Sequence, residues 1–455
     1  MEENYQQMSL WDLIYPRKII DKPIRLIELF SGIGAQHKAL KQLTDQVESW
    51  KTCEWAYNSY CSYNAIHIKD FTDYSQNLSK EELIEKVRGT STNYNEPLTD
   101  KQLKQKPIEW LRNAYNNIKA THNLINIMEV HGKDLEIVDT DKYEYIMTYS
   151  FPCQDLSLAG KRQGMGVSQK DGGTRSGLLW EVERILTECH ELGTMPQILL
   201  MENVPEVIGS ANLGDFTKWE HRLEELGYKN YVEILNAKNY GIPQNRRRCF
   251  MVSILGEYAY TFPIRLKREY SLKDILEKIV DKKYYLTNEH IERISNWKAQ
   301  QKPLENMQNV EKDNDESDEG GIPIVEATKK GYKVAHDGDG VDIGGRMKSH
   351  RGTVQKGLSQ TLKTDCDVGV VALSGVGSKL RIRKLTPKEC IRLMGFTDED
   401  YEAMRSIGMT DSAIYHMAGD SIVVTVLIGI FSQLMEEDKH KKVIPEYIKK
   451  GIVEK

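Results

Sequence analysis

The sequence predicts an α/β fold with a mostly parallel sheet and a second, smaller domain of irregular structure. Short apolar segments alternate with segments of helical period through residues 24–255, a pattern typical of parallel strands covered by helices. Residues 256–382 interrupt this pattern with many glycines and short alternating segments such as 368–373. With 40% hydrophobic and 28% charged residues among 455, the chain has the composition of a globular protein with a sizeable core.

The expected elements follow in chain order. Residues 24–30 form the first strand, and a glycine-containing turn and a helix come next. The other expected strands are 48–54, 143–150, 197–203, 229–237 and 249–255, and the expected helices include 57–67, 178–191, 216–226 and 385–396. We therefore expect a main domain at 1–255, a second domain at 256–382, and a return to the main domain at 383–455. The last of these begins with a helix that Thr386 caps, with Pro387 at its first position.

Residues 71–130 are an insertion in the main domain. They are polar, and Ser79 with Glu82 fits a capping box at the start of a helix. Apolar residues recur there at helical spacing, so we expect the insertion to pack on the sheet. These residues are Trp110, Leu111, Ala114, Ile118 and Ile125.

Several classes of protein are excluded by composition. The chain contains no apolar run of the roughly 20 residues that a membrane span needs. Its first residues lack the basic and apolar stretches of a secretory signal. Seven cysteines, none of them in a CxxC pair, suggest neither a disulfide framework nor a zinc ribbon. We expect a protein of the reducing cytoplasm that holds no metal.

The net charge of −5 conceals a basic segment. Residues 346–384 hold nine Lys or Arg and two Asp, a balance of +7, so the remaining residues sum to −12. Such a segment is a candidate surface for contacting phosphates. On charge alone, a solvated loop explains it equally well.

The turn after the first strand is the first candidate binding element. It contains Gly32 and Gly34, and glycines after a strand let the backbone approach a ligand closely. The dinucleotide fingerprint needs a third glycine where His37 stands, which disfavours NAD. Glu54 ends the next strand, where a carboxylate can bond ribose hydroxyls, and Trp55 beside it can cover an adenine. The alternative is a tight turn with a surface glutamate.

Three further segments carry candidate catalytic residues. Cys153 follows Pro152 after a strand, although a lone cysteine is more often a small buried hydrophobe. Glu202 ends an apolar strand, where a carboxylate is costly unless it is paired or used. In the segment 244–248, strand alternation places Arg246 and Arg248 on one face and Arg247 on the other. A basic edge strand is the alternative for these arginines.

The order and spacing of these segments resemble the DNA cytosine-5 methyltransferase family. The matching segments are FSGIGA, CEWA, SFPCQDLS, ENV, QNRRRCF, RKLTPKECIRLMGF and AGDSIVV, which span residues 26–430. SFPCQDLS together with GTRSGLLW at 173–180 resembles bacterial enzymes that methylate CpG. The resemblance implies a Rossmann-like S-adenosylmethionine-dependent methyltransferase sheet and a target-recognition domain at 256–382. It also implies a restriction-modification, phage or solitary methylation setting.

The resemblance also implies roles for individual residues. Cys153 would be the nucleophile that attacks carbon 6 of cytosine, and Glu202 would contact N3 of the ring. Arg248 would contact O2, with Arg246 supporting the loop. Residues implied to bind S-adenosyl-L-methionine are Phe30, Gly32, Gly34, Glu54, Trp55, Asp134, Leu178, Ser421 and Ile422.

The implied substrate is double-stranded DNA with an extruded base. The residues implied to hold the extruded nucleotide's backbone are Ser157, Arg175 and Thr361. The expected protein is a monomer that needs no physical partner, including any cognate restriction endonuclease. Asp420 replaces the asparagine that the family usually has before Ser421, which puts its contact with the cofactor in doubt.

Two other readings remain at this stage. One is an RNA methyltransferase, but that branch usually has Pro-Pro-Cys where this chain has Phe151-Pro152-Cys153, and it lacks so large a second domain. The other is a catalytically inactive DNA-binding subunit, which the intact Cys153, Glu202 and Arg248 disfavour.

Overall fold

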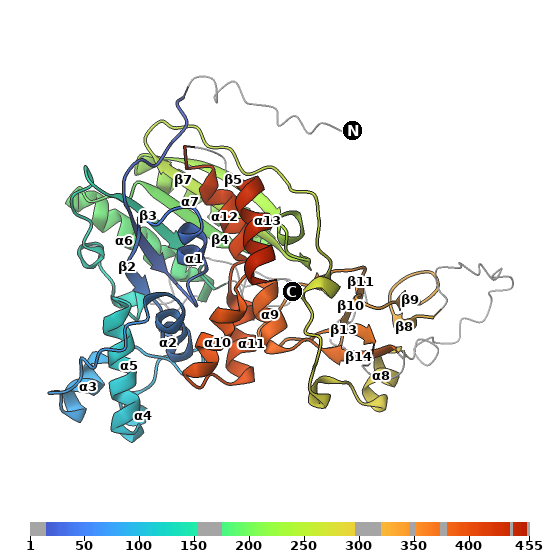
Figure 1. Ribbon diagram of the computed structural model, residues 1–455. Helices are drawn as coiled ribbons and strands as arrows, with labels where there is room; N and C mark the ends of the chain where they lie inside the picture. The colour runs from blue at the N-terminus through green and yellow to red at the C-terminus, as the bar shows by residue number, and fades with distance from the viewer. Residues whose placement is uncertain are drawn as a thin grey trace.

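A mixed sheet of six strands forms the centre of the protein in a computed structural model (Figure 1). The structure describes residues 15–152, 175–295, 320–344, 352–373, 380–436 and 440–452, and only the backbone of residues 175 and 176. The strand order is β2-β1-β3-β4-β7-β5. The strands of this sheet are β1 (Ile24–Leu29), β2 (Val47–Cys53), β3 (Glu144–Tyr149), β4 (Ile198–Asn203), β5 (Tyr228–Asn236) and β7 (Arg247–Leu255). The first four are parallel, and β7 runs antiparallel to both β4 and β5.

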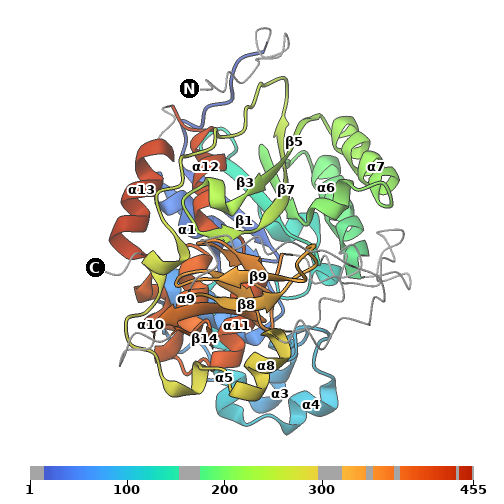
Figure 2. The same cartoon turned by 90° about the vertical axis from the view of Figure 1, so that its right-hand side faces the viewer.

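Helices cover both faces of this sheet, as the continuous apolar strands β3 and β4 require. Every residue of β3 and β4 is buried. In Figure 2, helices α1, α12 and α13 lie on one side of the sheet, and α6 and α7 lie on the other. Their bounds are α1 (Ala35–Lys41), α12 (Val424–Ser432), α13 (His440–Gly451), α6 (Leu179–Leu192) and α7 (Leu213–Glu225). The expected strands and helices of the main domain are thus confirmed to within a few residues.

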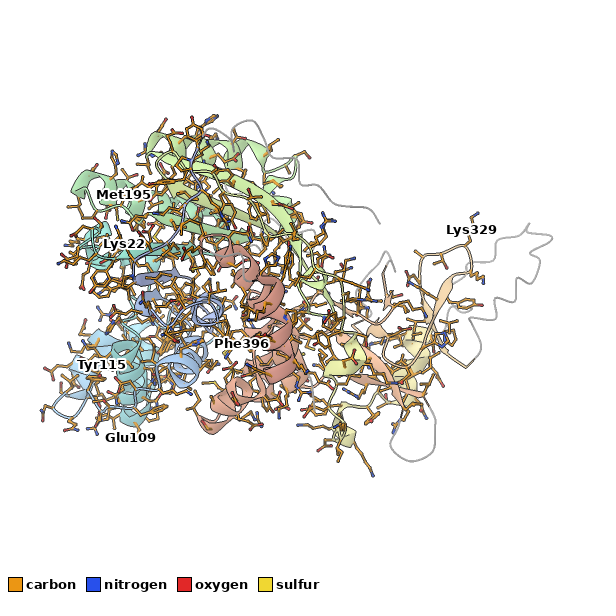
Figure 3. The ribbon with its side chains drawn as sticks, turned by 45° about the horizontal axis from the view of Figure 1, so that its top comes forward. Lys22, Glu109, Tyr115, Met195, Lys329 and Phe396 are labelled. Atoms are coloured by element: carbon orange, nitrogen blue, oxygen red, sulfur yellow. The ribbon has the colours of Figure 1, made fainter. Side chains whose placement is uncertain are left out.

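The insertion is helical, as predicted, and packs on the end of β2 and on α2 (Tyr57–Tyr63). It contains α3 (Lys80–Lys86), α4 (Asp100–Gln105) and α5 (Ile108–Ala120). The capping box between Ser79 and Glu82 is confirmed. Ile125 was wrongly placed in the helical pattern, because α5 ends before it and its φ is 64°. In Figure 3, Glu109 and Tyr115 of this insertion lie far from Lys329 at the tip of the second region.

The second region contains small sheets. Its strands are β8 (Ile322–Val325), β9 (Tyr332–Ala335), β10 (Gly340–Asp342), β11 (Val354–Gln355), β12 (Ser359–Gln360), β13 (Val368–Leu373) and β14 (Leu380–Lys384), and α8 (Asn288–Ser295) accompanies them. Four of them form a sheet in the order β11-β10-β13-β14. The strand β12 instead pairs with β6 (Gln244–Asn245) of the main body. The expected boundary between residues 382 and 383 falls inside β14.

Three helices connect the second region to the main domain: α9 (Pro387–Leu393), α10 (Asp398–Ser406) and α11 (Asp411–Asp420). Thr386 caps α9 with Pro387 at its start, as predicted. Phe396, at the centre of Figure 3, is fully buried after α9. The stretch Asp411–Ser432, which is α11 and α12, is apolar and long enough to pass as a membrane span, yet 89% of its apolar window is buried inside the fold. Core packing therefore accounts for its composition.

Candidate functional site

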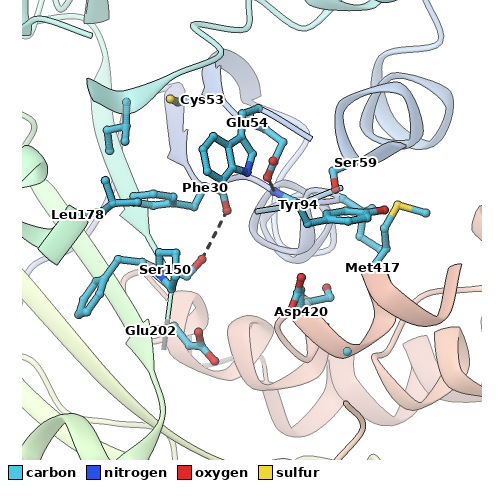
Figure 4. A pocket seen from close by; sticks show the side chains of 18 of the residues that line it. Phe30, Cys53, Glu54, Ser59, Tyr94, Ser150, Leu178, Glu202, Met417 and Asp420 are labelled. Carbon is cyan, nitrogen blue, oxygen red and sulfur yellow. Dashed lines mark hydrogen bonds between the residues drawn. The ribbon is translucent and has the colours of Figure 1, made fainter. Parts of the chain in front are cut away.

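A cavity of about 220 Å³ lies at the carboxyl ends of the first four strands. Phe30, Glu54, Ser150 and Glu202, each at or just past the end of its strand, contribute to its walls (Figure 4). The chain leaves β1 on one side toward β2 and returns on the other side as β3. Ligands of open α/β sheets bind at such a switch point. This cavity is therefore the candidate active site.

The glycine turn after β1 forms one edge of the cavity. Gly32 has a φ of 53°, and no atom lies within 4 Å of the position that a Cβ would occupy there. Its backbone is therefore open to a ligand. Gly34 has a different role, because a Cβ there would lie 2.5 Å from Nε2 of His67. Gly34 allows close packing beneath the turn and does not line the cavity.

Glu54 joins the turn to the end of β2. Its Oε2 accepts the Gly32 N–H at 2.9 Å, and its Oε1 accepts the Ala56 N–H at 2.8 Å. Removal from water raises the pKa of this carboxyl to about 7, against the lowering effect of the two backbone donors. The ionisation of Glu54 is therefore balanced near neutral pH.

Apolar side chains provide the walls around Glu54. Trp55 and Phe30 line the cavity together with Leu178 and Ile127, which come from elements on the other side of β1. Flat and branched side chains next to a carboxylate suit a ligand with an aromatic base and a hydroxylated sugar. Ser421 also lines the cavity, at the end of α11.

Glu202 and Arg248 form an ion pair at the opposite edge of the cavity. The guanidinium Nε lies 3.0 Å from Oε1 of Glu202, whose residue is only 7% exposed. Burial raises the pKa of Glu202, although the charges of Arg248 and Arg246 oppose the shift. The shift favours the protonated carboxyl, which is the form that can donate a proton. The ion pair with Arg248 meets the condition that a buried carboxylate at a strand end be paired or used.

Arg246, directly before β7, lines the cavity together with Arg248, as alternation predicted, while Arg247 is exposed. Its guanidinium donates to the backbone carbonyls of Leu362, Gly419 and Ser421 at 2.9–3.0 Å. It therefore joins the start of β7 to the second region and to the end of α11. Arg246 holds this side of the cavity together through buried hydrogen bonds.

The loop between β3 and the undescribed segment 153–174 is tied to its neighbours. The Asn203 amide donates to the Phe151 carbonyl at 3.1 Å, and the Ser150 hydroxyl donates to the Phe30 carbonyl at 3.4 Å. Pro152, the last described residue of this loop, lines the cavity. Cys153 and Ser157 lie outside the described residues, as does the side chain of Arg175.

Besides Gly34, two other predicted cofactor residues do not line the cavity. The buried Ile422 is not among its lining residues. Asp134 accepts the His131 N–H at 2.8 Å and caps a short 3₁₀ helix, Gly132–Leu135. The structure thus gives Asp134 a local structural role, and Asn126, earlier in the same connection, lines the cavity instead.

The basic segment is less available to phosphates than its composition suggests. Arg383 is 2% exposed and forms a buried ion pair with Glu389, so it cannot be part of a phosphate-contacting surface. Lys356 pairs with Asp339. Lys363 is exposed next to Thr361, whose hydroxyl donates to the Asn245 carbonyl at 2.7 Å. Lys363 is therefore a candidate for contacting a phosphate within the part of the segment that the structure describes.

Tyr94, Asn126 and His416 line the cavity and were not predicted from the sequence. Asp420, whose contact was left in doubt, also lines it, with an exposed carboxylate. Asn126 follows an irregular connection without periodicity, and Tyr94 and His416 meet only through tertiary packing. No local pattern marks any of the three.

Within the described ranges, no group of three or more His, Cys, Asp or Glu side chains could hold a metal ion. The six cysteines of those ranges are all buried, and none of them forms a disulfide with another.

Comparison with known proteins places this geometry in context. A model of the family described as C-5 cytosine-specific DNA methylase matches residues 93–436. The chain is 31% identical over 418 residues to a type II methyltransferase, M2.ScrFI, of Lactococcus lactis subsp. cremoris, covering 91% of this chain and 99% of that protein. It is 38% identical over 274 residues to the orphan methyltransferase M.SssI of Spiroplasma monobiae, covering 59% of this chain and 68% of that protein.

Solved structures show the same fold at low sequence identity. The methyltransferase EhMeth of Entamoeba histolytica aligns with 91% of this chain and 98% of its own, with a TM-score of 0.52 and 15% identity. The Dnmt2 methyltransferase of S. pombe aligns with 90% of this chain and 97% of its own, with the same TM-score and identity. The expected Rossmann-like methyltransferase fold is confirmed.

Proposed function

The chain belongs to the family of C-5 cytosine-specific DNA methylases, and from this premise we propose a specific mechanism for its DNA cytosine-5 methyltransferase activity. The methyl group passes from S-adenosyl-L-methionine to carbon 5 of a cytosine extruded from duplex DNA. One observation carries the proposal: the Glu202–Arg248 pair and the Gly32–Glu54 pair face the same cavity.

The residues of the cavity fit S-adenosylmethionine. Glu54 offers a carboxylate for ribose hydroxyls, and Trp55 and Leu178 offer apolar contact for an adenine. Phe30, Gly32 and Ser421 line the same cavity and would contact the methionine part of the cofactor. When bound, this cofactor supplies an electrophilic methyl group on a positively charged sulfonium. Asp134, Gly34 and Ile422 are left out of this assignment because they do not line the cavity.

The chemistry requires a nucleophile and a group that accepts charge. Carbon 5 of cytosine becomes nucleophilic when the thiolate of Cys153 adds to carbon 6. Glu202 donates its proton to N3 as charge develops on the ring, and Arg248 donates to O2. After methyl transfer, a base removes the carbon-5 proton, the double bond re-forms as the thiolate leaves, and the N3 proton returns to Glu202. The raised pKa of Glu202 supports its role as the proton donor.

The setting and partners are part of the same proposal. Extruding a base costs a few kcal/mol, which contacts in the pocket must offset. Residues 256–382 would read the target site and Thr361, Ser157 and Arg175 would hold the nucleotide backbone. We infer a monomeric cytoplasmic enzyme of a restriction-modification, phage or solitary system. The free cysteines among the described residues support a reducing compartment.

Methylation of a plasmid in cells tests the activity. Expression of the chain in a host that lacks cytosine methylation should leave 5-methylcytosine at one recurring site, which bisulfite sequencing identifies. The matched Cys153→Ser plasmid should carry none. Unmodified plasmid DNA from cells that contain the folded parent protein would refute the proposal.

Cofactor binding should depend on pH through Glu54. The carboxylate accepts hydrogen bonds from ribose hydroxyls best when it is ionised, and its pKa in the free protein is about 7. Below that pH, binding must release a proton, so affinity falls as the pH falls. From pH 8 to pH 6 we expect the affinity for S-adenosylmethionine to drop about tenfold, measured by calorimetry.

The Glu54→Gln variant is the control for this pH dependence. It should bind more weakly at pH 8 and lose the steep fall between pH 8 and pH 6. Titration of the cofactor's own amino group would persist in both proteins. Equal pH profiles for parent and variant would contradict the role of Glu54.

DNA affinity should depend on salt through the second region. Each phosphate contact releases counterions and contributes about 0.9 to the slope of log affinity against log salt. We expect Lys363→Glu to weaken binding to a duplex and reduce that slope by about one. Lys449→Glu on α13, also exposed, is the control. Equal slopes of log affinity against log salt for the parent and Lys363→Glu would show that Lys363 does not contact a DNA phosphate.

A further inference from the structure

The insertion contacts the segment beside the cavity at two points. At the first, between α3 and α4, the Ser91 N–H donates to the Trp55 carbonyl at 2.7 Å, and the Ser91 carbonyl accepts the Tyr57 N–H at 2.9 Å. At the second, after α5, the Asn123 side chain accepts the Glu54 N–H and donates to the Glu54 carbonyl, at 2.9 and 2.8 Å. The insertion thus braces the segment that carries Glu54 and Trp55 from both sides.

Between these two points, Tyr94 reaches the cavity and lines it. Its φ is 63°, a left-handed conformation that is unfavourable for a tyrosine and needs support from its surroundings. The Asn93 side chain gives that support by accepting the backbone N–H groups of Asn95 and Glu96. The backbone turn is thus built to present the Tyr94 ring in one direction.

The Tyr94 ring is fixed at two further points. Asn58 of α2 donates to its hydroxyl at 3.2 Å. The ring stacks on His416 of α11 with centroids 3.6 Å apart and planes 21° apart. His416 in turn lies 3.0 Å from the Asp420 carboxylate. Tyr94 of the insertion and His416 of α11 therefore meet at the cavity that both line.

Figure 4 shows the surroundings of Tyr94. Tyr94 lies beside Glu54 and near Met417 and Asp420, on the opposite side of the cavity from Leu178. A ligand held by Glu54 and Leu178 lies between Leu178 and Tyr94. Burial and the nearby carboxylates of Glu54 and Asp420 raise the pKa of Tyr94 to about 12, so its ring is neutral when a ligand enters.

We propose that Tyr94, stacked on His416, forms a wall of the S-adenosylmethionine site, which makes the insertion part of that site. The inference rests on the proposed function for the identity of the ligand. The pair contributes contact area and closes the gap between the insertion and α11, so it sets cofactor affinity more than the rate of methyl transfer. Tyr94 is a binding residue, and His416 positions it.

Calorimetric titration of the purified full chain tests this role. With S-adenosylmethionine and with S-adenosylhomocysteine, Tyr94→Ala should raise Kd about tenfold, given the usual worth of an aromatic contact. Tyr94→Phe keeps the stack and should stay within about threefold of the parent. His416→Ala should weaken binding, and the Tyr94→Ala, His416→Ala double variant should be little weaker than Tyr94→Ala alone.

Controls separate this role from a general loss of structure. Tyr74→Ala removes another tyrosine of the insertion, 41% exposed and away from the cavity, and should bind like the parent. In turnover assays, Tyr94→Ala should raise KM for the cofactor by a larger factor than it lowers kcat. If Tyr94→Ala melts at a lower temperature than Tyr74→Ala, its weaker binding does not by itself assign a role to Tyr94. The cofactor affinity of His416→Ala, alone and combined with Tyr94→Phe, then tests whether the stack contributes to binding.

The outcomes distinguish the two proposals. A parent protein that binds neither cofactor form would overturn the proposed function and this inference with it. A parent that binds, together with a Tyr94→Ala variant of equal affinity, would overturn the inference alone. A Tyr94→Ala effect on kcat without an effect on Kd would also overturn it.

Discussion

Cys153→Ser should lower methyl transfer to duplex DNA by about 10⁴-fold or more, while cofactor binding stays close to that of the parent. A serine hydroxyl is a far weaker nucleophile than a thiolate at neutral pH. Without addition to carbon 6, carbon 5 does not attack the methyl group. Transfer of a radioactive methyl group to DNA measures the rate, and calorimetry measures the cofactor affinity.

A second cysteine provides the matched control. Cys61 of α2 is buried, and its sulfur contacts the Asn113 side chain at 3.7 Å, a contact that a serine hydroxyl can keep. Cys61→Ser should retain most of the activity. If Cys153→Ser transfers methyl groups as fast as Cys61→Ser, Cys153 is not the nucleophile.

Glu202→Gln should lower turnover by about 10²–10⁴-fold and leave the affinity for the cofactor nearly unchanged. The amide has the shape of the carboxyl group and can contact N3, but it cannot transfer a proton to it. Burial favours the protonated carboxyl of Glu202 despite the neighbouring Arg248. Single-turnover kinetics with saturating DNA isolate this step from product release.

Glu206→Gln is the control for this substitution. Glu206 follows the same strand in the 3₁₀ helix Pro205–Ile208 and does not line the cavity. It should transfer methyl groups at nearly the parent rate. Equal single-turnover rates for Glu202→Gln and the parent would show that Glu202 does not protonate the ring.

The residues at strand ends could be predicted from the sequence because local rules place them. Glu54 directly follows β2 and Glu202 lies at the end of the apolar strand β4, and the ends of parallel strands meet at one edge of the sheet. The alternation of a strand correctly separated Arg246 and Arg248 from Arg247. These arguments needed only the period of the pattern and the direction of the strands.

Residues on irregular connections could not be predicted in this way. Asp134 has the expected charge, but a tight 3₁₀ helix uses its carboxylate as a cap, and Asn126 reaches the cavity instead. Arg383 belongs to a basic run, yet tertiary packing buries it against Glu389. Tyr94 and His416 stack only because the insertion folds back onto α11. Each of these outcomes depends on contacts between segments distant in the sequence.

The most direct test of the account is covalent trapping on duplex DNA that carries 5-fluorocytosine at the methylated site. Fluorine replaces the hydrogen on carbon 5 and cannot leave as a proton. The elimination therefore stops, and the bond between the Cys153 sulfur and carbon 6 cannot break. With S-adenosylmethionine present, mass spectrometry should show a one-to-one adduct whose modified peptide contains Cys153. An active enzyme that forms no adduct, or an adduct on another residue, would contradict the mechanism.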